Sequence, residues 1–119
     1  MNKKKSPKMV EGDCSKIILP VRDTLDVING KWKIMIIISM RHGNNRFRDI
    51  ERSIPNITSK VLAKELKDLE EHELIKRTVY DDYPVRVEYT LTDYAMTLEK
   101  LIRELKDWGM NHRKKMLGK

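Results

Sequence analysis

The chain has one cysteine, few aromatic residues and no long apolar run, and these shortages exclude several classes of protein. A single cysteine, Cys14, allows no intrachain disulfide and no multi-cysteine metal site. The longest apolar run, Ile34 to Ile38, is far shorter than the roughly 20 residues of a membrane-spanning helix. The basic start is not followed by an apolar segment, so we expect no secretory signal. The 119 residues therefore predict one soluble, cytoplasmic domain with no membrane association, no metal and no cofactor.

Positive charge is concentrated at the two ends and in one central block of a chain whose net charge is +7. Residues 1–8 and 112–119 carry basic side chains and no acidic ones, and residues 31–67 carry nine basic and three acidic side chains. Phosphate contacts need positive charge at fixed positions, so the central block favours a nucleic-acid partner, although solvated helix faces give the same pattern. We expect a flexible basic N-terminal arm at 1–13, a folded domain at 14–110 and a basic tail at 111–119.

Hydrophobic spacing predicts two short helices in the first half of the chain and leaves a third segment ambiguous. Val21, Leu25 and Ile28 fit one face of a helix with Pro20 in its first turn and a stop at Asn29-Gly30. Residues 47–54 form the second helix, which Pro55 ends. Between them, the β-branched run in 31–40 favours a buried strand by propensity, whereas its length favours a helix.

The second half predicts a long helix, a hairpin and a final helix. Leucines on one face and lysines on the other mark a helix at about 59–72, with Thr58 or Ser59 as its N-cap. Alternating residues predict strands at 75–80 and 85–91. A last helix is expected from Thr92, its apolar residues recurring every three or four positions up to Trp108. This order, four helices, two strands and one helix, is mainly α with a small β-hairpin and describes a winged helix-turn-helix.

The helices at 47–54 and 59–72, joined by a tight turn, form the helix-turn-helix signal. In such a pair the second helix lays its N-terminal half in the major groove of DNA. An amphipathic surface helix with lysines for solubility has the same pattern. Arg86 is a candidate for the wing, whereas Asp81 and Asp82 at the hairpin tip would repel phosphate.

The apolar residues of the final helix exceed what one small domain needs, which predicts a dimer, although packing within one chain is the alternative. The histidines His42, His72 and His112 are far apart in sequence, and no catalytic motif is present, so we expect no enzyme. The candidate dimerisation residues are Val21, Leu25, Ile28, Leu98, Leu101, Leu105 and Trp108.

Several segments carry a resemblance to a known family: Leu25 to Lys33 with its Gly-Lys-Trp, Ile54 to Leu62, Leu66 to Glu70, and Pro84 to Thr92 with its Arg-Val-Glu-Tyr. Over about residues 14 to 109 the chain resembles the HxlR-type winged helix-turn-helix regulators, which are related to the MarR group. The resemblance implies a helix at 31–40 and a homodimer that binds double-stranded DNA and represses or activates neighbouring genes. The positions expected to face DNA are Thr58, Ser59, Lys60, Lys64, Lys67, Arg86, Lys31 and Arg46, with Lys33 near the DNA backbone.

The chain departs from that family before its first helix. Family members often have Cys-Pro there, and some sense oxidants through that cysteine, whereas this chain has Leu19-Pro20 with Cys14 five residues upstream. Two alternative functions therefore stay open, a redox-switched regulator through Cys14 and a winged-helix module for protein contacts. A small-molecule effector is a further open expectation.

Overall fold

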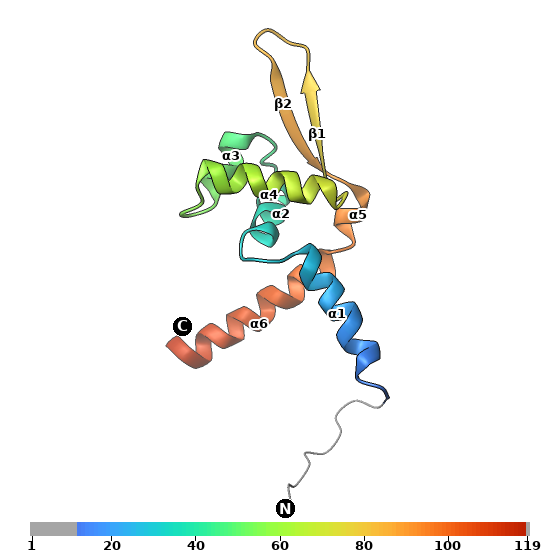
Figure 1. The fold of residues 1–119 in the computed structure, drawn as a ribbon. Coiled ribbons are helices and arrows are strands. Elements are labelled where there is room, and N and C mark those ends of the chain that lie inside the picture. Colours follow the sequence, from blue (N-terminus) through green and yellow to red (C-terminus); the bar gives the residue numbers. More distant parts are fainter. Residues whose placement is uncertain (1–11, 119) are drawn as a thin grey trace, which may run out of the picture.

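The computed structural model describes residues 12–118, and within them the chain forms six helices and one two-stranded antiparallel sheet. The helices α2, α3 and α4 form the body, the hairpin projects from one side of it, and α1 and α6 leave it on the other (Figure 1). This arrangement confirms the predicted winged helix-turn-helix. The elements in chain order are α1 (Ser15–Val27), α2 (Lys33–Arg41), α3 (Phe47–Ser53), α4 (Ser59–Glu71), β1 (Ile75–Tyr80), β2 (Arg86–Leu91), α5 (Asp93–Met96) and α6 (Glu99–Leu117).

The core lies where α2, α3 and α4 meet the base of the hairpin. The β-branched run that favoured a strand by propensity belongs to α2, as the family resemblance implied. Ile36, Ile37 and Met40 are buried on one side of this helix, while Met35 and Ile38 are exposed on the other. Packing on one face therefore outweighs strand propensity here. The other buried core residues are Ile50, Ile54, Ile57, Leu62, Leu66, Leu69, Leu74, Ile75 and Ala95.

The turn between α3 and α4 is fixed by local chemistry. Thr58 is the N-cap, since its Oγ1 accepts a hydrogen bond from the Val61 backbone N–H at 3.2 Å. Asn56 has a positive φ of 69°, a conformation that asparagine tolerates better than most residues. Ile54 and Ile57 are buried on either side of the turn. These contacts set the direction in which α4 leaves α3.

Helix α1 begins earlier than predicted. It starts at Ser15, so Pro20 lies inside the helix rather than in its first turn. A proline in this position removes one backbone hydrogen bond. Residues 12–20 are exposed, so water can bind the carbonyl that loses its partner. The described residues of the basic arm are Gly12 and Asp13, and residues 1–11 lie outside the described part of the chain.

The predicted final helix is broken in two. Thr92 is the expected N-cap, but it caps the four-residue α5, and the chain bends at Thr97 and Leu98 before α6 begins. Ala95 is buried and Leu98 packs against the core. The bend therefore leaves α5 packed against the body, while α6 extends away from it (Figure 1). The basic residues Arg113, Lys114 and Lys115 continue α6, which ends at Leu117, so the tail expected from residue 111 is helical through that residue.

A buried ion pair joins α2 to α4. Lys33 is 1% exposed, and its Nζ donates hydrogen bonds to Glu65 Oε1 at 3.0 Å and to Asn29 Oδ1 at 3.0 Å. Asp68 Oδ2 lies 3.4 Å from the same ammonium group. The expectation that Lys33 approaches the DNA backbone is therefore wrong, because its charge is used inside the fold.

Breaking this pair should destabilise the domain strongly. In Lys33→Met, the buried Glu65 carboxylate loses its buried cation and keeps only the exposed Lys64 nearby. Breaking a buried ion pair in this way typically costs about 3–5 kcal/mol of unfolding free energy. The double variant Lys33→Met with Glu65→Leu should recover most of that loss, since no buried charge is left unpaired. Urea unfolding at one fixed protein concentration measures both.

The matched control is Lys64→Met, because Lys64 pairs with the same carboxylates from an exposed position. It should change stability little. Equal midpoints for Lys33→Met and Lys64→Met would contradict the role assigned to the buried pair.

Candidate nucleic-acid interface

Helix α4 presents a polar face to solvent. Leu62, Glu65, Leu66 and Leu69 are buried, and these positions recur at helical spacing. The residues left exposed on the helix include Ser59, Lys60, Ala63, Lys64 and Lys67, as the sequence predicts. The exposed face therefore has the composition of a major-groove reader, and DNA contact by these side chains stays a prediction.

The three lysines on this face have different surroundings. Lys64 is 73% exposed, yet its Nζ lies 3.3 Å from Asp68 Oδ2 and 3.6 Å from Glu65 Oε1. Its hydrogen bond to Asp68 raises the pKa of Lys64 above the ordinary value. Among the described residues, no carboxylate lies within ion-pair distance of Lys60 or Lys67. Nearby carboxylates therefore offset the charge of Lys64, whereas no such carboxylate competes with an outside partner for Lys60 or Lys67.

Two residues at the start of α4 serve the fold as well as the surface. The Thr58 hydroxyl caps the helix, as described above. The Ser59 hydroxyl donates a hydrogen bond to Glu51 of α3. Both side chains are exposed, so they lie at the surface that DNA would approach. The Thr58 hydroxyl caps α4, as the sequence allows, while the Ser59 hydroxyl ties α4 to α3, a contact that the sequence did not reveal.

Arg86 of the wing is held by its own hairpin. Its guanidinium lies over the Tyr80 ring, 4.0 Å from the centroid, and its Nε donates to Asp82 Oδ2 at 2.9 Å. It also pairs with Glu88. These contacts stiffen the hairpin and neutralise one of the two tip carboxylates. An arginine engaged in this way is poorly placed to enter a groove, although the sequence predicts that role.

Arg77 is a wing cation that the sequence analysis missed. In the alternating pattern of the strand, Arg77 falls on the same side as the apolar Ile75 and Val79, so the pattern does not mark it as a DNA contact. The structure leaves Arg77 exposed on β1, where it lines a groove with Ala63, Lys67 and the acidic Glu70 of α4. The groove joins the basic face of α4 to the wing. The positive net charge of residues 31–67 indicates a basic surface from the sequence alone, but Arg77 lies outside these residues and is not indicated by it.

The two remaining DNA candidates lie outside α4 and the wing. Lys31 is exposed just before α2, and its Nζ lies 4.8 Å from the centroid of the Trp32 ring. Arg46 is exposed at the residue before α3. The neighbouring Asn45 carbonyl accepts a hydrogen bond from the Tyr89 N–H at 2.8 Å, which ties this loop to the wing. Both cations are therefore at the surface, but neither lies on α4.

The predicted dimerisation residues divide into two groups. Ile28 is buried within the chain, Leu98 packs against the core, and Leu101 is half-buried. The exposed group consists of Val21 and Leu25 on α1 and Leu105 and Trp108 on α6, with Trp108 69% exposed. Within the described residues, neither α1 nor α6 buries a residue fully. Two amphipathic helices thus keep apolar surface in contact with solvent.

Cys14 is exposed at the residue that precedes α1. Within residues 12–118, no helix is long and apolar enough to cross a membrane. The histidines His42, His72 and His112 lie at the end of α2, at the end of α4 and on α6.

A family model described as HxlR-like helix-turn-helix matches residues 27–116, which is most of the chain and includes the core, α4 and the wing. The chain belongs to this family of transcriptional regulators. The HTH-type transcriptional regulator YtcD of Bacillus subtilis is 41% identical over 103 residues, which are 87% of this chain and 82% of YtcD. The family match confirms the resemblance read from the Gly-Lys-Trp and Arg-Val-Glu-Tyr segments.

Solved structures of related transcriptional regulators have the same fold as this chain. The redox regulator HypR in its reduced form has a TM-score of 0.76 and 39% identity, covering 84% of this chain and 99% of HypR. A MarR-family regulator from Enterococcus faecalis V583 has a TM-score of 0.69 and 32% identity, covering 92% of this chain and 96% of that protein. The HxlR-like chain therefore shares its architecture with MarR-family proteins.

The surroundings of the α4 lysines predict an order of effect on DNA binding. Lys60→Gln and Lys67→Gln should each weaken binding about fivefold or more and lower the slope of log affinity against log salt concentration by about one or more. Lys64→Gln should have a smaller effect, because its ammonium must first leave Asp68. Fluorescence anisotropy on a duplex from the region flanking the coding sequence measures both quantities.

Lys100→Gln is the control, since Lys100 is an exposed lysine on α6. It should leave affinity and salt slope unchanged. If Lys60→Gln and Lys67→Gln bind DNA as the control does, α4 is not the DNA-contacting helix.

Proposed function

We propose that this chain acts as a homodimer that binds a two-fold symmetric DNA site and represses or activates neighbouring genes. The observation that carries the proposal is the combination, in one chain, of a basic exposed face on α4 with uncovered apolar side chains on α1 and α6. In this proposal the protein acts in the cytoplasm, has no catalytic activity and needs no cofactor. The scattered positions of the three histidines support the absence of catalysis.

The uncovered apolar side chains support a second copy of the chain as the partner. Helix α6 has 19 residues and α1 has 13, and helices of this length in water gain most of their stability by packing an apolar face. A second copy covers the same surfaces on both chains in one closed two-fold interface. The proposed interface consists of Val21, Leu25, Leu105 and Trp108, with the half-buried Leu101 at its edge.

A two-fold dimer presents two α4 helices to one face of DNA. In helix-turn-helix dimers, each second helix enters a major groove, and the half-site centres lie about one helical turn or a multiple apart. Lys60 and Lys67 then contact phosphates or guanine edges, and Arg77 and Arg46 contact phosphates beside the groove. In this proposal Arg86 keeps the wing in shape, and Lys31 reaches only the outer backbone.

A protein-interaction module is the weaker alternative. Such a module needs an apolar rather than a basic outer face on α4. The exposed lysines of α4 are unfavourable for burial in a protein interface.

Introducing a charge into the proposed interface should separate the two chains. In Leu105→Glu, a carboxylate replaces a side chain that is 48% exposed in one chain and buried in the proposed dimer. We expect a shift from dimer to monomer in sedimentation velocity. Affinity for the DNA site should fall at least about tenfold, because the two half-sites are no longer bound together.

Met110→Glu is the matched control, since Met110 is an exposed apolar residue about 140° around α6 from Leu105. It should sediment as the unaltered dimer. A Leu105→Glu protein that sediments and binds like the control would exclude this interface.

Redox control through Cys14 is a second candidate, which its exposure before α1 and the similarity to the redox regulator HypR favour. It predicts that mild oxidation with diamide gives a disulfide-linked dimer on non-reducing gels and changes DNA affinity. Both effects should disappear in Cys14→Ser, and dithiothreitol should reverse them. An oxidised protein without a linked dimer and with unchanged DNA binding would exclude this candidate.

A further inference from the structure

Two lysines and two carboxylates form a closed ring of ion pairs between α2 and α4. Lys33 Nζ lies 3.0 Å from Glu65 Oε1 and 3.4 Å from Asp68 Oδ2. Lys64 Nζ lies 3.6 Å and 3.3 Å from the same two oxygens. The two positive and two negative charges cancel within the ring. Removing one member therefore leaves the other three with an unbalanced charge.

The members of the ring differ in how far they reach the surface. The side chains of Lys33 and Glu65 are 2% and 7% exposed, that of Asp68 is 33% exposed and that of Lys64 is 73% exposed. Lys33 also donates a hydrogen bond to Asn29, which holds it inside the fold with or without Lys64. Lys64 is therefore the member that can leave the ring for an outside partner while the others stay in place.

Asp68 is the carboxylate that holds Lys64 at the surface. Lys64 Nζ donates a hydrogen bond to Asp68 Oδ2 across the i, i+4 spacing of the helix. This bond draws the ammonium toward the C-terminal end of α4, whereas the N-terminal half of such a helix contacts bases. Burial alone would raise the pKa of Asp68, but its hydrogen bonds with Lys64 and Lys33 hold that pKa below the ordinary value. The carboxylate is thus charged at neutral pH.

A backbone phosphate is a poor replacement for this ring. If Lys64 moves to a phosphate, two carboxylates remain with Lys33 alone, and the excess negative charge lies beside the DNA backbone. A guanine edge instead offers two acceptors, O6 and N7, at one position in the major groove. Leaving the ring is equally unfavourable at every DNA site, whereas the compensating base contact depends on the sequence.

We propose that Asp68 is a positioning residue for DNA specificity, which keeps Lys64 from phosphates at random sites and yields it to a guanine edge at the correct site. Its carboxylate thereby lowers the affinity for non-specific DNA more than the affinity for the specific site, and the ratio of the two affinities rises. Asp68 acts through Lys64 and contacts no DNA itself. This inference rests on the proposed function, in which α4 enters the major groove.

Fluorescence anisotropy with two duplexes tests this role, one from the region flanking the coding sequence and one a scrambled sequence of the same composition. Asp68→Asn keeps an oxygen that can accept from Lys33 but loses the charge that holds Lys64. On the scrambled duplex it should raise affinity at least fourfold and steepen the slope of log affinity against log salt by about one, because Lys64 joins the phosphate contacts. The flanking duplex should gain less, so the preference for it should fall.

Two further variants separate this effect from a general change of charge. Glu71→Gln removes the same charge from an exposed position less than one turn along α4, and its affinity for the scrambled duplex should stay within twofold. Adding Lys64→Gln to Asp68→Asn should return both the affinity and the salt slope on that duplex to those of the unaltered protein. In both of these proteins no free ammonium group is present at position 64.

A measurement on the unaltered protein needs no substitution. The NMR signal of the Asp68 carboxyl carbon should move when the flanking duplex is added, because Lys64 leaves this carboxylate. It should stay in place when the scrambled duplex is added.

A scrambled-duplex affinity that is unchanged in Asp68→Asn, that rises as much in Glu71→Gln, or that stays raised in the double variant would overturn the role of Asp68. So would an Asp68 signal that moves equally with both duplexes or with neither. If the unaltered protein binds the two duplexes equally, the proposed function fails. The comparisons on scrambled DNA then still decide whether Asp68 keeps Lys64 from phosphates.

Discussion

The buried contact between Lys33 and Glu65 is a constraint on which the orientation of α4, the helix proposed to contact DNA, depends. It joins the first residue of α2 to the middle of α4, on the same buried face of α4 as Leu62, Leu66 and Leu69. Removing two charges from water is unfavourable, so the pair forms only where both groups meet with good geometry. That requirement, together with the buried leucines of α4, sets the rotation of this helix and leaves Lys60 and Lys67 on its exposed face.

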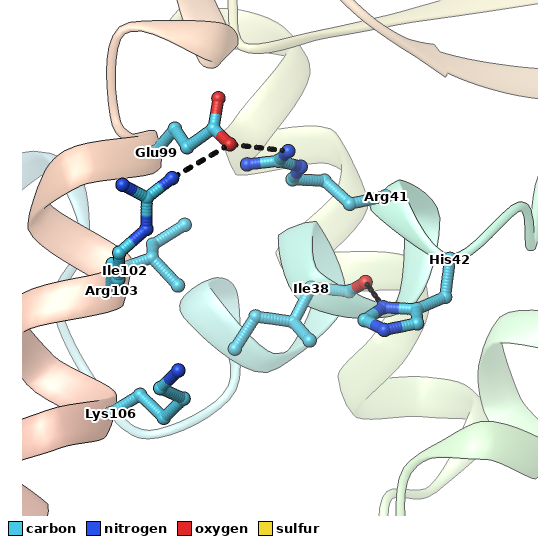
Figure 2. A pocket seen from close by; sticks show the side chains of 7 residues that line it. All are labelled: Ile38, Arg41, His42, Glu99, Ile102, Arg103 and Lys106. Carbon is cyan, nitrogen blue, oxygen red and sulfur yellow. Dashed lines mark hydrogen bonds and ion pairs between the residues drawn. The ribbon is translucent and has the colours of Figure 1, made fainter.

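The rest of the molecule divides at the bend before α6. On one side, α2, α3, α4 and the wing complete their own core. On the other, α1 and α6 extend from the body and keep apolar side chains exposed (Figure 1). Glu99 at the start of α6 joins the two parts through its ion pair with Arg41 at the end of α2 (Figure 2). In the proposed homodimer, a change at that junction alters the separation of the two α4 helices.

Local signals allowed much of this fold to be predicted from the sequence. The leucine spacing of α4, the strand alternation of the hairpin and the cap at Thr92 depend on neighbouring residues, so they could be found without a structure. The α2 segment needed the family resemblance, because its β-branched run reads as strand or helix until its packing is known. The bend at Thr97 and Leu98 was missed because the apolar spacing continues across it.

The candidate site was harder to predict, because the environment of each charge is a tertiary property. Lys33, Lys60, Lys64 and Lys67 are the same residue type, yet one is buried, one is paired at the surface, and two have no carboxylate at ion-pair distance among the described residues. Sequence spacing placed three of them correctly on the outer face of α4. It could not show that Lys33 faces Glu65, or that Arg86 is held by its own hairpin.

The central claim is that two copies of α4 read one DNA site together, and selection from a pool of random duplexes by the purified protein tests it most directly. Sequencing of the bound fraction should give an inverted repeat whose half-site centres lie about 10 base pairs, or a multiple of that, apart. Enrichment of a single asymmetric half-site, or no enrichment above the starting pool, would contradict the account.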